Sequence, residues 1–171
     1  MVIDVSLCRG TIEEALAAAP ARRLLAIGED SARLFAAYCE RHPATRLVEL
    51  SGADPAKALG ASPPFDLAFV ANTLERLPRA EGARLIAGLR DLYATRLYVL
   101  VPTGTAWDGQ LDSLWSATDL IAYGLKASAR YAIDGRPVQL FRHDLYDYKE
   151  TPDWLNAKHW ANPELWDKYR W

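Results

Sequence analysis

The clearest signal of a fold in this sequence is the segment Phe65-Asp66-Leu67-Ala68-Phe69-Val70-Ala71-Asn72-Thr73-Leu74-Glu75-Arg76-Leu77-Pro78. Its first half is a nearly continuous apolar run, which is typical of a strand buried on both faces of a parallel sheet. A polar corner follows, and apolar residues at helical spacing begin after Arg79. In α/β sheets, ligands bind beyond the carboxyl ends of such strands. The stretch therefore predicts an α/β fold with a candidate site around Asn72.

The rest of the chain, up to about residue 145, alternates between short apolar runs and helical spacings. Strands are predicted at residues 23–27, 46–51 and 97–101, and a hairpin at 128–133 and 138–142 around the turn residues Asp134-Gly135. Helices are predicted at residues 11–19 with Thr11 as the cap, after the corner at 29–31 as far as about residue 41, at 79–93, and at 111–123 with Gly124 as the stop. This order predicts a mostly parallel sheet with one reversed strand.

Residues 65–78 resemble the segment after strand four of class I S-adenosylmethionine-dependent methyltransferases, in which a Phe-Asp-hydrophobic run enters an Asn-x-Leu-Glu-x-Leu-Pro turn. The resemblance extends over residues 11–145, and Tyr123-Gly124-Leu125 with the hairpin looks like the family's last helix and final strand pair. It implies a three-layer Rossmann-like methyltransferase fold, mostly parallel, with one antiparallel strand near the C-terminus. The short connection between Ser51 and Pro63 predicts that the usual third strand is missing or replaced by a helical turn at residues 54–59.

In this family the carboxypropyl and ribose groups of the cofactor lie over a glycine-rich loop after the first strand. Gly28 matches the first glycine of that loop, whereas Asp30 and Ala32 stand where the second and third belong, and Ala26 replaces an acid. The Asp30 side chain adds bulk and negative charge where a ligand carboxylate needs space, and it could cap the following helix itself. The candidate cofactor contacts in this degenerate loop are Gly28, Glu29, Asp30 and Ser31. The alternative is a tight turn before a capped helix, with no ligand.

Two further candidate cofactor contacts lie near the ends of the second and third predicted strands. Glu49 resembles the family's acid that accepts hydrogen bonds from both ribose hydroxyls, a task for which a carboxylate offers two acceptor oxygens. Alternatively, Glu49 is a solvated acid near an arginine. Asn72, with Glu75, would line the rim near the methyl donor, or Asn72 would cap the helix that follows.

No acid–base pair stands out, so catalytic residues remain unassigned; many methyl transfers need only positioning. Because the loop is degenerate, we expect weak or absent binding of S-adenosylmethionine and a non-catalytic binding or scaffold protein, a pseudoenzyme. The alternative is an active S-adenosylmethionine-dependent methyltransferase acting on a small molecule or a protein, with Gly28, Glu49 and Asn72 as cofactor contacts.

Composition narrows the choice of partners and compartment. The chain has 171 residues with a formal net charge of -2, and its pI is about 5.9, which disfavours nucleic acid and anionic membranes as partners. It has no basic leader and no apolar run that could span a bilayer, so we expect a cytoplasmic location. The two cysteines and three histidines are isolated, which predicts buried or half-buried thiols and no metal site.

The last residues form a tryptophan-rich tail. We divide the chain into a methyltransferase-like domain at residues 1–147 and a tail at 148–171, which holds four of the six tryptophans. Four basic residues balance four acidic ones in the tail, so it is not a polybasic anchor. The tail could pack on its own domain, form a contact with a protein partner or a second copy in a homodimer, or lie at a membrane interface.

Overall fold

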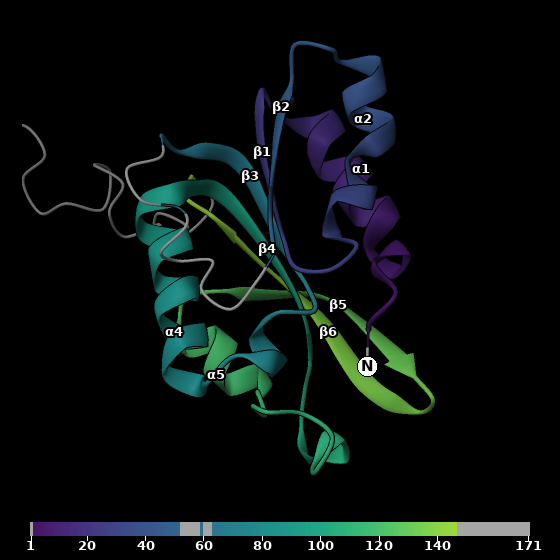
Figure 1. Cartoon of the computed structure of the whole chain (residues 1–171), viewed down its shortest axis with the longest axis vertical. Helices are drawn as coiled ribbons and strands as arrows, with labels where there is room; N and C mark the ends of the chain where they lie inside the picture. Colours follow the sequence, from purple (N-terminus) through teal and green to yellow (C-terminus); the bar gives the residue numbers. More distant parts are fainter. Residues whose placement is uncertain (1, 52–58, 60–62, 147–171) are drawn as a thin grey trace, which may run out of the picture.

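A six-stranded sheet forms the centre of the protein (Figure 1). The computed structural model describes residues 2–51, 59 and 63–146. The strands are β1 (Arg23–Ile27), β2 (Arg46–Leu50), β3 (Phe65–Val70), β4 (Ala94–Pro102), β5 (Lys126–Ile133) and β6 (Arg136–Asp144), and their order in the sheet is β2-β1-β3-β4-β6-β5. β1 to β4 are parallel, and β6 pairs antiparallel with both β4 and β5. Only β6 therefore runs against the other described strands, which confirms the predicted mostly parallel sheet with one reversed strand.

Helices cover both faces of the sheet (Figure 1). The 3-10 turns η1 (Val5–Cys8) and η2 (Ser31–Leu34) accompany α1 (Arg9–Ala18) and α2 (Ala36–Arg41) on one face, and the opposite face carries α4 (Arg79–Gly88) and α5 (Ala117–Ala122). Side chains of β1 alternate between the two cores: Leu24 and Ala26 belong to the first, and Leu25 and Ile27 to the second. This alternation gives the three layers that the sequence predicts.

The predicted helix stop and the predicted hairpin turn are both confirmed. Gly124 has a φ of +82° just after α5, as a left-handed helix stop requires. Asp134 and Gly135, at the tip of the β5–β6 hairpin, both have positive φ values, +50° and +76°. Two central residues with positive φ are what a type I′ hairpin turn needs.

Three predicted helix boundaries are wrong. α1 begins at Arg9, so Thr11 lies inside it and is not its cap. The helix after β1 is divided into η2 and α2. The helix predicted at residues 111–123 is confined to α5, because the backbone N–H groups of Asp112 and Ser113 donate to the carbonyl of Glu75 at 3.0 and 3.1 Å. These tertiary hydrogen bonds hold residues 111–116 out of a helix.

A polar network connects the amino ends of β1, β3 and β4 with α1. The guanidinium of Arg96, which is buried, donates to the carbonyls of Ala15 and Ala19 at 2.6 Å each and to that of Asp66 at 3.2 Å. The Asp66 carboxylate in turn accepts the backbone N–H groups of Arg22 and Arg23 at 2.7 and 2.8 Å. Because every one of these contacts is to backbone, the charges at this end of the sheet serve the fold.

Two predictions concern parts of the chain outside the described residues. The predicted absence of the third strand and the helical turns at 54–59 fall in residues 52–62, of which only Leu59 is described. Within the described residues, β2 lies at one edge of the sheet. The division into a domain at 1–147 and a tail at 148–171 also stays a prediction, because the description ends at Tyr146.

Candidate functional site

The carboxyl ends of β1, β2 and β3 meet around Gly28. The N–H of Gly28 donates to the carbonyl of Leu50 at 2.9 Å, and the N–H of Ala71 donates to that of Ile27 at 3.1 Å. A cavity of about 400 Å³ opens here, lined by Ile27, Gly28, Glu29, Leu50, Ser51, Asn72, Thr73, Arg76 and Leu77. A second cavity, of about 210 Å³, is lined by Ala26, Gly28, Asp30, Ala32, Arg33, Glu49, Leu50 and Ser51. The two cavities share Gly28, Leu50 and Ser51, and we call them together the strand-end groove.

Gly28 is held against the end of β3 by backbone contacts. It has a φ of +92°, and a Cβ at this position would lie 1.8 Å from the carbonyl oxygen of Ala71 and 2.3 Å from Oγ1 of Thr73. Thr73 Oγ1 is itself hydrogen-bonded to that carbonyl at 2.8 Å. The missing side chain of Gly28 thus makes room for the protein's own chain at the floor of the groove.

The polar side chains of the loop after Gly28 bind neighbouring residues of the chain, although not in the way that the sequence predicts. Asp30 lies in the left-handed region with a φ of +61°, and its side chain makes no capping hydrogen bond to η2, so the predicted cap is wrong. Instead its carboxylate pairs with Arg33 at 3.0 Å. Ser31 is buried, and its hydroxyl donates to the carbonyl of Ile27 at 2.8 Å. The turn therefore closes on itself through side chains of its own residues.

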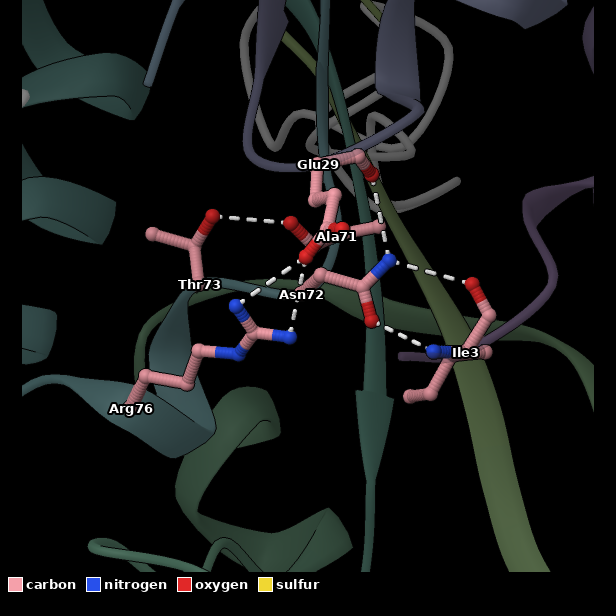
Figure 2. A network of polar contacts seen from close by, with 6 residues as sticks. All are labelled: Ile3, Glu29, Ala71, Asn72, Thr73 and Arg76. Carbon is pink, nitrogen blue, oxygen red and sulfur yellow. Dashed lines mark hydrogen bonds and ion pairs between the residues drawn. The ribbon is translucent and has the colours of Figure 1, made fainter. Parts of the chain in front are cut away.

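Asn72 connects three segments at the centre of the site, as Figure 2 shows. Its Oδ1 accepts the N–H of Ile3 at 2.6 Å, and its Nδ2 donates to the carbonyls of Ile3 at 3.0 Å and Glu29 at 3.1 Å. Asn72 lines the larger cavity, yet these contacts occupy its amide. It does not cap η3 (Leu74–Arg76), so that alternative is wrong.

Glu29 and Arg76, which both line the larger cavity beside Asn72, form an ion pair. Both terminal nitrogens of Arg76 donate to one carboxylate oxygen of Glu29, at 3.2 and 3.3 Å (Figure 2). Glu29 comes from the loop after β1 and Arg76 from η3 after β3, so the pair joins the segments that follow two strands through residues that are 47 positions apart in the chain. Because both side chains are about half exposed, the pair contributes little to stability, but both of its residues line the larger cavity.

Glu49 lies at the carboxyl end of β2 and lines the smaller cavity. Its side chain is exposed, and it forms no hydrogen bond or ion pair with any residue in the described ranges, including Arg22, Arg23 and Arg46. Among the acids that line the strand-end groove, Glu49 therefore keeps both carboxylate oxygens available for a ligand.

Glu75 lies away from the rim at which the sequence places it. Its side chain is 1% exposed and lines neither cavity of the groove, and neither carboxylate oxygen has a hydrogen-bond partner among the residues that the structure describes. Burial raises the pKa of Glu75, an effect that the nearby Arg76 charge and backbone amides oppose only in part. A buried acid without a partner destabilises the protein when it ionises.

Replacing Glu75 with glutamine is expected to make the protein more stable at pH 7 and to reduce the dependence of stability on pH. The folded state holds the Glu75 proton more tightly than the unfolded state, so wild-type stability falls as the pH rises above the ordinary glutamate pKa of 4.5. Urea denaturation between pH 4.5 and 8 measures this slope. Glu14→Gln, at an exposed position on α1, is the matched control and should keep the wild-type slope. A Glu75→Gln variant with the wild-type slope would show that Glu75 does not titrate differently on folding.

The described residues offer no metal site and no reactive thiol. No group of three or more His, Cys, Asp or Glu side chains in these ranges could hold a metal ion. Burial raises the pKa of Cys8 to about 12, and Cys39 is half-buried, as predicted for small apolar residues. No described helix combines the length and the apolar character needed to cross a bilayer.

Sequence reasoning did not identify Ile3, Ser51 or Thr73 as parts of this site. Ser51 is the last residue of the strand predicted at 46–51, a position that could have marked it. The contact between Ile3 and Asn72 joins residues that are 69 positions apart and involves the backbone of Ile3, so no local sequence pattern predicts it.

Comparison with known proteins shows which family and which folds the chain is similar to. Residues 7–171 match a family model described as "Family of unknown function (DUF6231)". A search of curated proteins found no match. Among solved structures, the chain is similar to the N-terminal domain of EvdMO1 with S-adenosylhomocysteine (SAH) bound, at 13% identity, a TM-score of 0.53 and coverage of 82% of this chain and 81% of that one.

Two further similar structures are magnesium protoporphyrin IX methyltransferase (ChlM) from Synechocystis PCC 6803 with bound SAH, and TehB from Haemophilus influenzae. The first has 10% identity, a TM-score of 0.50 and coverage of 80% of this chain and 81% of that one. The second has 9% identity, a TM-score of 0.51 and coverage of 79% and 62%. At such identities the similarity shows the fold alone, and it confirms the methyltransferase-like architecture that residues 65–78 suggest.

Proposed function

We propose that this chain, which belongs to the family of unknown function DUF6231, is a methyltransferase-like protein with a degenerate S-adenosylmethionine site that acts as a non-catalytic binding or scaffold protein. One observation supports the proposal: the polar side chains at the ends of β1 and β3 already bind other groups of the protein. Asn72 binds Ile3 and Glu29, and Arg76 binds Glu29. Groups that would have to face a methyl donor are already bonded to each other.

The loop after β1 supports the same proposal. The Asp30 carboxylate occupies the position of the second family glycine and borders the smaller cavity. Ala71 and Thr73 lie against Gly28, where a ligand chain would make its close approach. An amino-acid group that carries a carboxylate therefore meets side-chain bulk and negative charge in this region.

The alternative is an active S-adenosylmethionine-dependent methyltransferase acting on a small molecule or a protein. One observation favours it: Glu49 keeps its carboxylate available beside an open cavity, as a residue that holds ribose hydroxyls would. Gly28, Glu49 and Asn72 would then be the cofactor contacts. Similar folds with SAH bound show that the architecture accommodates the cofactor in those proteins.

Calorimetric titration of S-adenosylmethionine and SAH into the full chain tests the proposal. We expect a Kd weaker than about 100 μM for both ligands, which corresponds to less than about 5.5 kcal/mol of binding free energy. Replacing Asp30 and Ala32 together with glycine should tighten binding about tenfold if the rest of the site is retained, because it removes the extra carboxylate and Cβ atoms.

Asp134→Gly is the matched control for that variant, because Asp134 is also an aspartate with positive φ, but it lies in the β5–β6 turn away from the groove. It should bind as the wild type does. Micromolar binding by the unmodified protein, with formation of SAH in the presence of an acceptor, would refute the non-catalytic proposal and establish the enzyme.

The tryptophan-rich tail at residues 148–171 is the part of the chain that we propose as a contact for a protein partner or a second copy. A chain that ends after Asp147 is expected to melt at a lower temperature or to aggregate, because each large aromatic side chain can bury about 150–250 Å². Differential scanning calorimetry and light scattering measure both effects, and a dimer should become a monomer if the tail forms the contact. If the melting temperature, solubility and mass are unchanged, the tail does not stabilise the domain. It would then serve an external partner, which a pull-down with the isolated tail peptide would identify.

A further inference from the structure

Four hydrogen bonds attach residues 112–115, which precede α5, to the turn that carries Glu75. All four donors lie in this segment, and all four acceptors are backbone carbonyls of residues 74–77. The pairs are the N–H groups of Asp112 and Ser113 with Glu75 at 3.0 and 3.1 Å, the Ser113 hydroxyl with Leu77 at 2.5 Å, and Nε1 of Trp115 with Leu74 at 3.1 Å. The position of the 112–115 segment therefore depends on the conformation of η3.

The same segment has a second attachment, to α4. The guanidinium of Arg79 donates to the carbonyl of Leu114 at 2.7 Å, and its central carbon lies 3.7 Å from the ring centroid of Trp115. Arg79 also pairs with Asp119 of α5 at 2.7 Å. These contacts do not involve η3, so the segment can separate from η3 while it remains attached to the helices.

Glu75 takes part in the first attachment through its backbone and carries a buried carboxyl on its side chain. Its carbonyl accepts two of the four hydrogen bonds, and its carboxylate has no hydrogen-bond partner among the described residues. An ionised carboxylate in such a place is strongly unfavourable unless it reaches water. Because the carboxylate and the carbonyl belong to one residue of a 3-10 turn, a movement that hydrates the carboxylate also displaces the carbonyl that holds Asp112 and Ser113.

Burial is the largest influence on the ionisation of Glu75. The elements packed against η3 are α4, β4 and the 112–115 segment, and their charged or titratable side chains are Arg79, Glu81, Arg84, Arg96, Tyr98 and Asp112. Burial raises the pKa of Glu75, and backbone amides together with the charges of Arg76 and of the amino terminus oppose this effect only in part. The amino terminus stays charged below about pH 7, so its influence is constant in weakly acidic solution.

We propose that Glu75 and residues 112–115 form a pH-sensitive latch: the segment stays on η3 while Glu75 is protonated, and it detaches in a larger fraction of molecules once the carboxyl ionises. The latch also sets the shape of the strand-end groove, because η3 carries Arg76 and is followed by Leu77, and both line the larger cavity. This wall of the groove is fixed in acid and becomes adaptable near neutral pH. The latch goes beyond the proposed function, since it operates whether or not a ligand binds.

The pH range of the latch follows from the two states of Glu75. In the open state the carboxyl is hydrated and has the ordinary glutamate pKa of 4.5, whereas burial holds its pKa above that value in the closed state. The closed state therefore holds the proton more tightly. Its advantage over the open state is complete below pH 4.5 and is lost as the pH rises through the raised pKa. The open fraction increases by at most about tenfold per pH unit and then levels off.

Amide hydrogen exchange in the full chain, measured by NMR at Asp112 and Ser113 between pH 4.5 and 7, tests the latch. After correction for the intrinsic exchange rate, the protection of both amides should fall several-fold over this range. It should change little in low urea, because a local opening exposes little surface, whereas the Leu97 amide in the central strand β4 should follow global unfolding. In Glu75→Gln the protection should not depend on pH. In the matched control Glu14→Gln, at an exposed position on α1, it should depend on pH as in the wild type.

Two further measurements do not rely on Glu75→Gln. Ser113→Ala removes the hydrogen bond to the Leu77 carbonyl and should lower the protection of Asp112 several-fold at every pH, with the pH dependence retained. The Arg76 amide, which donates to the carbonyl of Thr73 at 3.1 Å, reports on η3 and should lose protection over the same pH range as Asp112.

The latch is overturned if Glu75→Gln retains the wild-type pH dependence, or if Asp112 and Ser113 exchange with the urea dependence of Leu97, which would mean global unfolding alone. Wild-type protection in Ser113→Ala, or an Arg76 amide whose protection does not change with pH, overturns it as well. S-adenosylmethionine takes no part in these measurements, so their failure leaves the proposed function unaffected. Micromolar cofactor binding, in turn, would refute the proposed function without affecting the latch.

Discussion

Replacing Gly28 with alanine is expected to destabilise the protein by more than about 4 kcal/mol or to prevent its folding. Two penalties combine at this position. A left-handed backbone, here with a φ of +92°, disfavours any residue with a Cβ by roughly 1–2 kcal/mol. In addition, the new Cβ would lie 1.8 Å from the carbonyl oxygen of Ala71, so the ends of β1 and β3 would have to separate. Chemical denaturation of the purified variant measures the loss.

Gly104→Ala is the matched control for Gly28→Ala. Gly104 has a similar φ of +84°, but nothing lies within 4 Å of the position that a Cβ would take there. Gly104 has a ψ of 175°, a combination that essentially only glycine adopts, so its substitution should show a backbone penalty alone, of about 1–3 kcal/mol. If the two alanine variants lose the same stability, the close approach between Gly28 and Ala71 is not what makes glycine necessary in this loop.

Replacing Asn72 with alanine is the second change with a large expected effect, a loss of about 3 kcal/mol. The variant removes three hydrogen bonds and leaves the N–H and carbonyl of Ile3 buried without their partner, at about 1–3 kcal/mol for each unsatisfied group. Urea denaturation measures the stability. Hydrogen exchange at the Ile3 amide should become much faster, because the contact that fixes the first residues to the site is lost.

Asn72→Gly distinguishes the side-chain contacts from the backbone conformation. Asn72 has a φ of +51°, which glycine adopts without strain, so this variant loses the hydrogen bonds but no backbone preference. It should be destabilised nearly as much as the alanine variant. Wild-type stability together with a protected Ile3 amide in Asn72→Gly would show that the amide of Asn72 does not anchor the first segment.

The fold could be predicted from the sequence because its signals are local. The run from Phe65 to Val70 is apolar at nearly every position, which is typical of a short strand buried on both faces. Asp134-Gly135 supplies two residues that tolerate positive φ, and the hairpin forms around them. The helix predicted at 111–123 was too long because Asp112 and Ser113 bind the carbonyl of Glu75, which lies 37 and 38 residues before them in the chain.

Local sequence patterns were sufficient to predict the order of the described elements, the position of the candidate site at the strand ends, and the presence of Gly28, Glu49 and Asn72 there. Periodicity and turn chemistry are properties of neighbouring residues, so one chain is enough to recognise them. The contacts of each side chain, by contrast, depend on tertiary structure. Among the described residues, Asn72 binds Ile3 and Glu29, the buried carboxylate of Glu75 has no hydrogen-bond partner, and the carboxylate of Glu49 is available. Whether a polar side chain serves the fold or a ligand depends on which distant groups folding brings within about 3 Å of it, and distances between distant groups are not encoded in any local pattern.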